Sequence, residues 1–329
     1  MRALLALSLV MLGGGERWTP RHEPEAAYRR EFTRIAKVQV TDAYVRANGE
    51  EKHVENPGLS SEESNRVVVT ERALSVQDGA LLVLERRYDE LARSLRGTQP
   101  GKDGKPQQRD RADTGALEGR TVRFERAKPA EDFEARLVDK DGPREELPRL
   151  EADMGAWGIL PESAPAIGGS WKIGAERFRA ALLRPGGRPR WPLLAGAPPA
   201  EERLTEGLWD AMRGELELRY VERVEREGRS YARIELKGSI ELAAETRRGE
   251  GENGAARYRR EGQGELAGTL EWSLGEGCTS AFELEMKLRM SATEWGELKT
   301  KDGESLEVER ELESDVVEKL TYKAERVAG

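Results

Sequence analysis

Residues 266–290 read LAGTLEWSLGEGCTSAFELEMKLRM, in which apolar and polar residues alternate on both sides of a short glycine turn. Leu266 and Trp272 share one parity before the turn, and Phe282 and Met286 share one after it. Successive side chains of a β-strand point to opposite faces, so this alternation predicts two half-buried strands. The Gly-Glu-Gly between them is typical of a hairpin turn. The stretch therefore predicts an antiparallel hairpin with one apolar face and one charged face.

The same alternation extends through much of the chain. It covers 215–242 and 306–322, and weaker versions occur at 32–40 and 121–137. The uninterrupted apolar strands that are typical of a parallel sheet do not occur in the sequence. We therefore predict a mainly β fold, built from large twisted antiparallel sheets.

A short repeat links the two halves of the sequence. Gly115-Ala116-Leu117-Glu118-Gly119 resembles Gly264-Glu265-Leu266-Ala267-Gly268, and a Phe-Glu pair follows each at the same spacing. A duplication would produce two related half-barrel-like units, whereas chance similarity in a chain rich in Glu and Gly is the alternative. The units we expect are an N-terminal β unit over 16–140, with a mobile loop at 97–114, and a C-terminal β unit over 214–329.

The segment between these units, 141–213, has a different composition. It is rich in proline, predicts short helices at 176–183 and 201–213, and contains four of the seven tryptophans. These tryptophans either line an apolar groove on a curved sheet or close the dry face of the sheet as a plug, since each large ring buries much apolar area. The plug is the favoured interpretation, because a thin core needs such rings. The candidate ligand-lining residues, which include one from the C-terminal unit, are Trp157, Trp171, Trp191, Trp209 and Trp272.

The composition excludes several classes of protein. The chain has 329 residues, with 54 Lys and Arg against 62 Asp and Glu, and its net charge is −8. Charged residues reach 35% and hydrophobic residues only 37%, which argues against a membrane bundle and predicts a heavily solvated protein. The acidic balance argues against nucleic acid as a partner. The one cysteine, Cys278, excludes an intrachain disulfide.

The first residues predict export. Met1 and Arg2 precede an uncharged apolar run at 3–12, and three glycines follow before the sequence becomes polar. This order is typical of a secretory signal peptide, and a buried N-terminal helix is the alternative. The run is shorter than the ~20 residues needed to span a bilayer, so we expect no integral membrane span. We predict a signal peptide over 1–15 and a periplasmic or extracellular location.

The sequence predicts no catalytic residue, no metal site and no cofactor. The segment 139–142 reads DKDG, but it lacks the later ligands of a calcium loop. His22 and His53 are the only histidines, which with Cys278 leaves too few ligands for zinc. The sequence also lacks the Gly-x-Ser-x-Gly motif of a nucleophile elbow. A pair of carboxylates acting as in a glycosidase stays open, although solvated surface residues account for the many acidic side chains.

Three short motifs in the chain resemble motifs of a known group of proteins. They are LPESAPAIGGSWKI at 160–173, GEL at 214–216 and GTLEW at 268–272. In these motifs the chain resembles exported bacterial β-rich proteins, periplasmic or lipoprotein-like, whose function is unknown. The resemblance implies an envelope location and a β-sheet fold, and it implies no catalytic residues.

Our leading functional hypothesis is an exported, non-catalytic protein that binds an apolar or amphipathic ligand in the concavity of a sheet. The expected partner is a lipid-like or other apolar small molecule, or an envelope protein. The alternatives are a structural or interaction module of the cell envelope and, less favoured, a carboxylate-dependent hydrolase.

Overall fold

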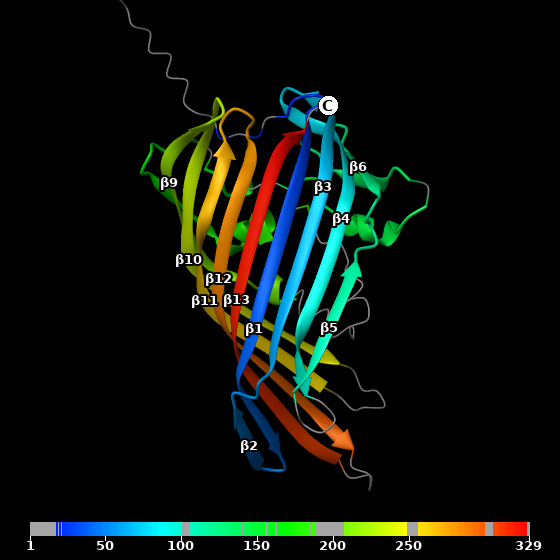
Figure 1. The fold of residues 1–329 in the computed structure, drawn as a ribbon, viewed down its shortest axis with the longest axis vertical. Coiled ribbons are helices and arrows are strands. Elements are labelled where there is room, and N and C mark those ends of the chain that lie inside the picture. The colour runs from blue at the N-terminus through cyan, green and yellow to red at the C-terminus, as the bar shows by residue number, and fades with distance from the viewer. Residues whose placement is uncertain are drawn as a thin grey trace, which may run out of the picture.

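The computed structural model describes residues 18, 20, 22–100, 106–139, 141–154, 157–161, 163–183, 186–187, 207–248, 256–299 and 305–327. The expected signal peptide over 1–15 lies outside them. In the described residues, long β-strands run along an elongated molecule (Figure 1). Strands of about 20 residues form because apolar and charged side chains alternate over their length, which gives each strand one dry and one wet face. The mainly β, antiparallel prediction is confirmed.

The C-terminal half forms a continuous meander. Its strands are β8 (Ser170–Gly174), β9 (Arg213–Arg226), β10 (Arg229–Arg248), β11 (Ala256–Ser273), β12 (Cys278–Lys299) and β13 (Ser305–Val327). The hairpin read from 266–290 is the upper part of β11 and β12, in which Leu270 pairs with Phe282. The inward residues Leu216, Ile234 and Leu284 are each buried.

The N-terminal half forms a second meander. Its strands are β1 (Ala27–Ala47), β2 (Glu50–Glu55), β3 (Ser60–Gln77), β4 (Ala80–Pro100), β5 (Pro106–Thr114), β6 (Thr121–Glu125) and β7 (Glu134–Leu137). The two halves join where the first and last long strands pair, from Ala27 opposite Val327 to Ala47 opposite Val308. All the described strands therefore belong to one sheet, in the order β7-β6-β4-β3-β1-β13-β12-β11-β10-β9-β8, with β2 and β5 attached to β1 and β4.

The segment 97–114, which we expected to be a mobile loop, is different in the structure. Residues 97–100 end β4, and β5 pairs with them and with the residues before them, from Ala92 opposite Thr114 to Pro100 opposite Pro106. The prediction of a loop was wrong for residues 97–100 and 106–114, because β5 has no alternation of apolar and polar residues that would mark it as a strand; residues 101–105 lie outside the described residues. Backbone pairing to β4 supports it instead, and its described side chains are mostly exposed.

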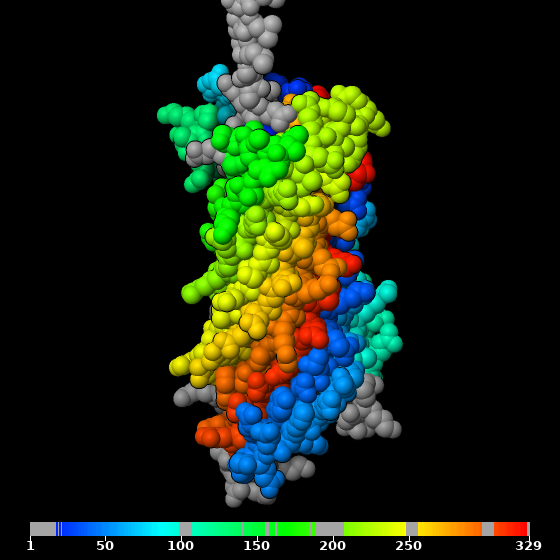
Figure 2. All heavy atoms as spheres, turned by 90° about the vertical axis from the view of Figure 1, so that its left-hand side faces the viewer, coloured from blue at the N-terminus to red at the C-terminus, as the bar shows by residue number. Residues whose placement is uncertain are grey.

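The segment between the halves covers the upper part of the sheet (Figures 1 and 2). It contains the 3-10 turns η1 (Arg144–Arg149) and η2 (Trp157–Ile159), helix α1 (Ala175–Phe178) and the π-helical turn η3 (Arg179–Leu183). The helix predicted at 176–183 is therefore present as α1 and η3. Of the second predicted helix, 201–213, the described residues 207–210 are helical, whereas 211–212 are not and Arg213 begins β9. The sequence did not predict β8, which lies in this segment and pairs with β9.

Two apolar clusters form the core. The larger lies between the C-terminal strands and the intervening segment, and it contains Phe178, Leu182 and Trp272. The smaller lies on β3, β4 and β6 and contains Val69, Leu84 and Phe124. Both clusters form because the apolar face of a strongly curved sheet is buried against itself and against the covering segment. No helix in the described part of the chain is long and apolar enough to cross a membrane.

Candidate functional site

A cavity of about 530 Å³ lies where segments distant in sequence converge at the upper end of the sheet. It is bounded by the residues before β1, the start of β4, the loop between β6 and β7, residues 152–154, and the turn between β11 and β12. Its volume is in the range of small-molecule binding sites. The cavity therefore lies at the junction of the two meanders, beside β1.

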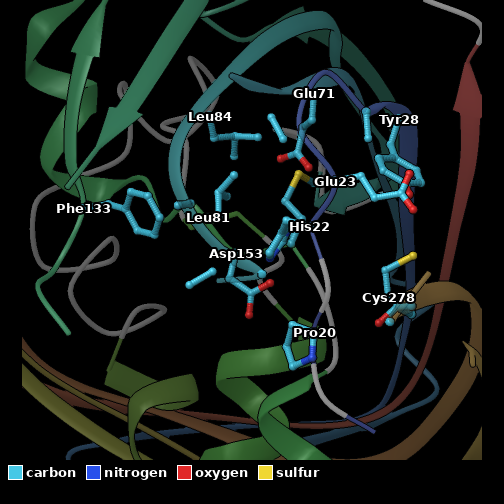
Figure 3. A pocket seen from close by; sticks show the side chains of 18 of the residues that line it. Pro20, His22, Glu23, Tyr28, Glu71, Leu81, Leu84, Phe133, Asp153 and Cys278 are labelled. Atoms are coloured by element: carbon cyan, nitrogen blue, oxygen red, sulfur yellow. The ribbon is translucent and has the colours of Figure 1, made fainter. Parts of the chain in front are cut away.

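The cavity has a large apolar wall. Figure 3 shows Leu81, Leu84 and Phe133 on one side, with Tyr28 and Cys278 on the other. The apolar residues and aromatic rings that line it are Ala26, Tyr28, Ala73, Ala80, Leu81, Leu84, Pro129, Phe133, Ala152, Met154 and Trp272. This wall forms because β4 presents its dry face to the cavity while the loop after β6 folds over it. An apolar molecule or tail is the natural occupant of such a wall.

A buried ion cluster forms the polar part of the cavity. Glu71 on β3 lies between two guanidinium groups: Arg30 Nε lies 2.5 Å from its Oε2, and Arg86 Nη2 lies 2.6 Å from its Oε1. Arg86 is fully buried and also donates to the carbonyl oxygens of Glu151 and Ala152, at 2.8 and 2.6 Å. Arg30 Nη1 donates to Tyr322 Oη on β13. Two buried cations therefore share one buried carboxylate.

The protonation states of this cluster follow from its burial and charges. Burial alone would raise the pKa of Glu71, but the charges of Arg30 and Arg86 and their hydrogen bonds outweigh it, so its pKa lies below 4.5. Burial raises the pKa of Tyr322 to about 12, although the charge of Arg30 opposes the rise. Burial likewise raises the pKa of Cys278 to about 11. At neutral pH the carboxylate is ionised, while the phenol and the thiol are neutral.

His22 lies in the middle of the cavity (Figure 3). Its pKa is lowered from 6.5, first by burial and then by the charges of Arg30 and Arg126, which outweigh the opposing effect of Glu71. Arg126 is held in the wall because its Nε donates to Leu81 O at 2.8 Å and its guanidinium stacks on the Phe133 ring. The imidazole is therefore neutral at pH 7, in a site whose potential is positive.

A second cluster of ion pairs lies on the same face of the sheet as the first. Arg34, two residues after Phe32 on β1, forms a bidentate ion pair with the buried Glu318, with N–O distances of 2.6 and 2.8 Å. It also reaches Glu63 at 3.2 Å, and Arg93 donates to the other oxygen of Glu63 at 2.8 Å. These two cations and two anions balance, unlike the cluster at the cavity.

Of the five tryptophans named from the sequence, Trp272 alone among the described side chains lines the cavity. Its ring is buried, and its Nε1 has no hydrogen-bond partner among the described residues. Trp171 and Trp209 pack against the larger core cluster, and Trp171 Nε1 donates to Ile159 O at 2.9 Å. The side chain of Trp157 and the whole of Trp191 lie outside the described residues.

Sequence reasoning did not identify the cavity residues Arg30 and Glu71, nor Arg86 and Trp18, which are buried outside the cavity wall. Trp18, just before the cavity segment, is buried and packs edge-on against Trp171 and Tyr220, at ring-centroid distances of 5.7 and 5.0 Å. The sequence did contain one signal. Arg34 falls on the same face of β1 as Phe32, and Glu318 falls among the apolar residues of one face of β13. A charge on the dry face of a strand predicts a buried partner.

Two groups of the cavity wall are poorly suited to catalysis. A neutral thiol with a pKa of about 11 is a poor nucleophile, and Glu71, held ionised by two arginines, is a poor general acid. No group of three His, Cys, Asp or Glu that could hold a metal ion occurs in the described part of the chain.

No protein-family model matches the chain, and no curated protein matches it in sequence. Among solved structures, it is similar to OccK7 (OpdD) of Pseudomonas aeruginosa at 8% identity and a TM-score of 0.22, covering 93% of this chain and 100% of that one. An outer membrane channel from Pseudomonas putida F1 has 9% identity and a TM-score of 0.22, over 93% and 97% of the two chains. The outer membrane protein OprG from Pseudomonas aeruginosa has 7% identity and a TM-score of 0.20, over 92% and 98%. Likenesses at this level carry no argument about activity, substrate or location.

Proposed function

We propose that this protein is an exported, non-catalytic binding protein, and that it holds an amphipathic small molecule in the cavity beside Trp272. The cavity itself carries the proposal, because a volume of about 530 Å³ with one apolar wall and one polar cluster suits such a molecule. The apolar leader-like run at 3–12 supports export. Processing near Gly15 leaves the buried Trp18 in the mature chain.

The test is binding of two uncharged or singly charged amphiphiles, 1-decanol and decanoate, to the purified mature protein. Native mass spectrometry measures the stoichiometry, and the fluorescence of the tryptophans, which include Trp272 in the cavity wall, follows binding. We expect one molecule of at least one amphiphile per chain. Absence of a complex with both would overturn the proposal.

A matched pair of variants places the ligand. Ala80 lines the cavity, so Ala80→Phe fills it, whereas the exposed Ala116 lies in the turn before β6 and Ala116→Phe leaves the cavity unchanged. We expect Ala80→Phe to weaken binding at least tenfold and Ala116→Phe to leave it as it is. Equal binding by both variants, each with an unchanged circular dichroism spectrum, would place the ligand elsewhere and overturn the assignment of the cavity.

A further inference from the structure

The buried charges at the cavity do not balance. Arg30 and Arg86 are two cations with exposed fractions of 8% and 0%, and both pair with the one buried carboxylate of Glu71. Two carbonyl oxygens of residues 151 and 152 satisfy the remaining donors of Arg86. One positive charge of the pair is therefore left without a counter-charge from Glu71, and Arg30 is the member of the pair that lines the cavity. An unbalanced buried charge is costly, and a bound ion of opposite sign relieves that cost.

The donors of Arg30 are also not all used within the described residues. Its Nε faces Glu71 and its Nη1 donates to Tyr322, which leaves Nη2 for a ligand. A second donor is available, since Trp272 lines the same cavity and its buried Nε1 has no partner in the described part of the chain. Both groups only donate hydrogen bonds. The polar end of the cavity therefore offers hydrogen-bond donors and positive charge.

The other acidic residues of the cavity wall do not cancel this charge. Glu23, Asp78 and Asp153 line the cavity but are exposed to solvent, so water screens their charges more strongly than those of the buried groups. Glu23, with a side chain 61% exposed, also pairs with Arg326 at 2.8 Å. The lowered pKa of His22, caused by burial and then by Arg30 and Arg126, agrees with a positive interior.

From these observations we infer that the ligand is an amphipathic monocarboxylate, with its head against Arg30 and Trp272 and its apolar tail along Leu81, Leu84 and Phe133. This inference rests on the proposed function. Arg126 also lines the cavity but is only half-buried, so the buried excess is one positive charge, which a single negative charge matches. A carboxylate accepts from a guanidinium in a strong, charge-assisted hydrogen bond. A phosphate monoester would bring about two charges and leave the cavity unbalanced in the opposite direction.

The experiment compares four ligands with the same ten-carbon tail: decanoate, 1-decanol, decyltrimethylammonium and decyl phosphate. Dissociation constants are measured on the full mature protein by tryptophan fluorescence and isothermal titration calorimetry. We expect decanoate to bind at least tenfold more tightly than decanol, and the cation to bind most weakly. This series needs no variant, so it tests the inference even where a substitution prevents folding.

Three variants then assign the preference to one residue. Arg30→Met should remove the preference for decanoate over decanol, and Arg30→Lys should keep part of it. Arg289→Met serves as the control, because Arg289 lies on the outer face with a side chain 71% exposed, and it should leave the preference unchanged.

The possible outcomes separate the two proposals. Equal binding of decanoate and decanol, or tighter binding of the cation, would overturn the monocarboxylate inference and leave the proposed function standing. Tighter binding of decyl phosphate than of decanoate would overturn the assignment of a singly charged head. Failure of all four ligands to bind would overturn the proposed function itself, and the inference with it.

Discussion

Glu71 is the carboxylate on which two buried arginines depend. Glu71→Gln would keep the shape of the side chain but leave Arg30 and Arg86 buried without an opposite charge. We expect the free energy of unfolding to fall by about 3–5 kcal/mol, the usual cost of breaking a buried ion pair on one side. Urea unfolding followed by circular dichroism measures this loss.

The control for this variant is Glu215→Gln. Glu215 pairs with Lys172 at 2.5 Å, but both side chains are more than half exposed. Exposed pairs contribute little to stability, so the control should unfold at nearly the wild-type urea midpoint. Equal losses of unfolding free energy in the two variants would contradict the conclusion that Glu71 balances two buried arginines.

The dependence of stability on acid pH follows from Glu71 and Glu63. Burial opposes ionisation of both carboxylates, but the charges of Arg30 and Arg86 on Glu71, and of Arg34 and Arg93 on Glu63, hold both pKa values below 4.5 in the folded state. A lowered folded-state pKa contributes stability that is present above the unfolded-state pKa and is lost as pH falls through the folded-state pKa. Unfolding free energies measured between about pH 3 and pH 7 should therefore decline below about pH 4.5.

Glu71→Gln removes one of these two buried carboxylates, so its acid decline should be shallower than that of the wild type. An identical pH profile in this variant would show that Glu71 is not held ionised by its neighbours.

Cys278 offers a chemical probe of the cavity. The thiolate is the reactive form of a cysteine, and burial raises the pKa of Cys278 from 9.0 to about 11. At pH 8 its reaction with iodoacetamide should therefore be ~100-fold slower than that of the same residue in the urea-unfolded protein. Mass spectrometry measures both rates, and a folded-state rate close to the unfolded one would contradict the burial of this thiol.

At the scale of single elements, helix α1 acts as a plug on the larger core cluster. Phe178 in α1 is fully buried there, and Ile167 in the loop before β8 is 60% exposed. We expect Phe178→Ala to lower the free energy of unfolding by about 3–5 kcal/mol, because it removes apolar contacts and leaves a cavity. Ile167→Ala, the control, should change it by less than about 0.5 kcal/mol. A Phe178→Ala protein as stable as the control would mean that α1 does not cover the core.

The elements that could be predicted from the sequence are those with one dry face. The hairpin of β11 and β12, strands β9, β10 and β13, and the pair of β6 and β7 were predicted because their apolar residues recur at every second position. β5 was missed because its described side chains are mostly exposed, so no alternation marks it. β8 was missed because its five residues lie among prolines and glycines.

The candidate site was largely hidden from sequence reasoning for a related reason. Arg30, Glu71 and Arg86 look like the many solvated charges around them, and only the pairing of β1 with β3 and of β3 with β4 brings them together. Trp272 was named from the sequence and does line the cavity. Its four companions were named because of their local composition, which indicates little about which cavity a ring reaches.

At the scale of the whole molecule, pairing of the first and last long strands makes two meanders into one sheet. β13 is consequently an interior strand, in which Val317 pairs with Lys37 on β1 and Lys287 on β12. β2 is a peripheral strand, and Val54 pairs with Ala43 on β1. Proline removes a ladder hydrogen bond and is tolerated only at sheet edges, so its effect reports the position of a strand.

We therefore expect Val317→Pro to destabilise the protein by about 3 kcal/mol or more, and Val54→Pro to leave the thermal midpoint nearly unchanged. Differential scanning calorimetry measures both variants. A mild effect at Val317 would mean that β13 lies at an edge and that the halves form separate sheets.

The central claim, that the cavity at the junction of the two meanders holds an amphipathic carboxylate, is tested most directly by crystallography with decanoate brominated at its tail end. The account predicts an anomalous bromine peak beside Leu81, Leu84 and Phe133, with the carboxylate within hydrogen-bond distance of Arg30. A bromine peak outside the cavity, or a carboxylate that faces the mouth with the bromine beside Arg30, would contradict it.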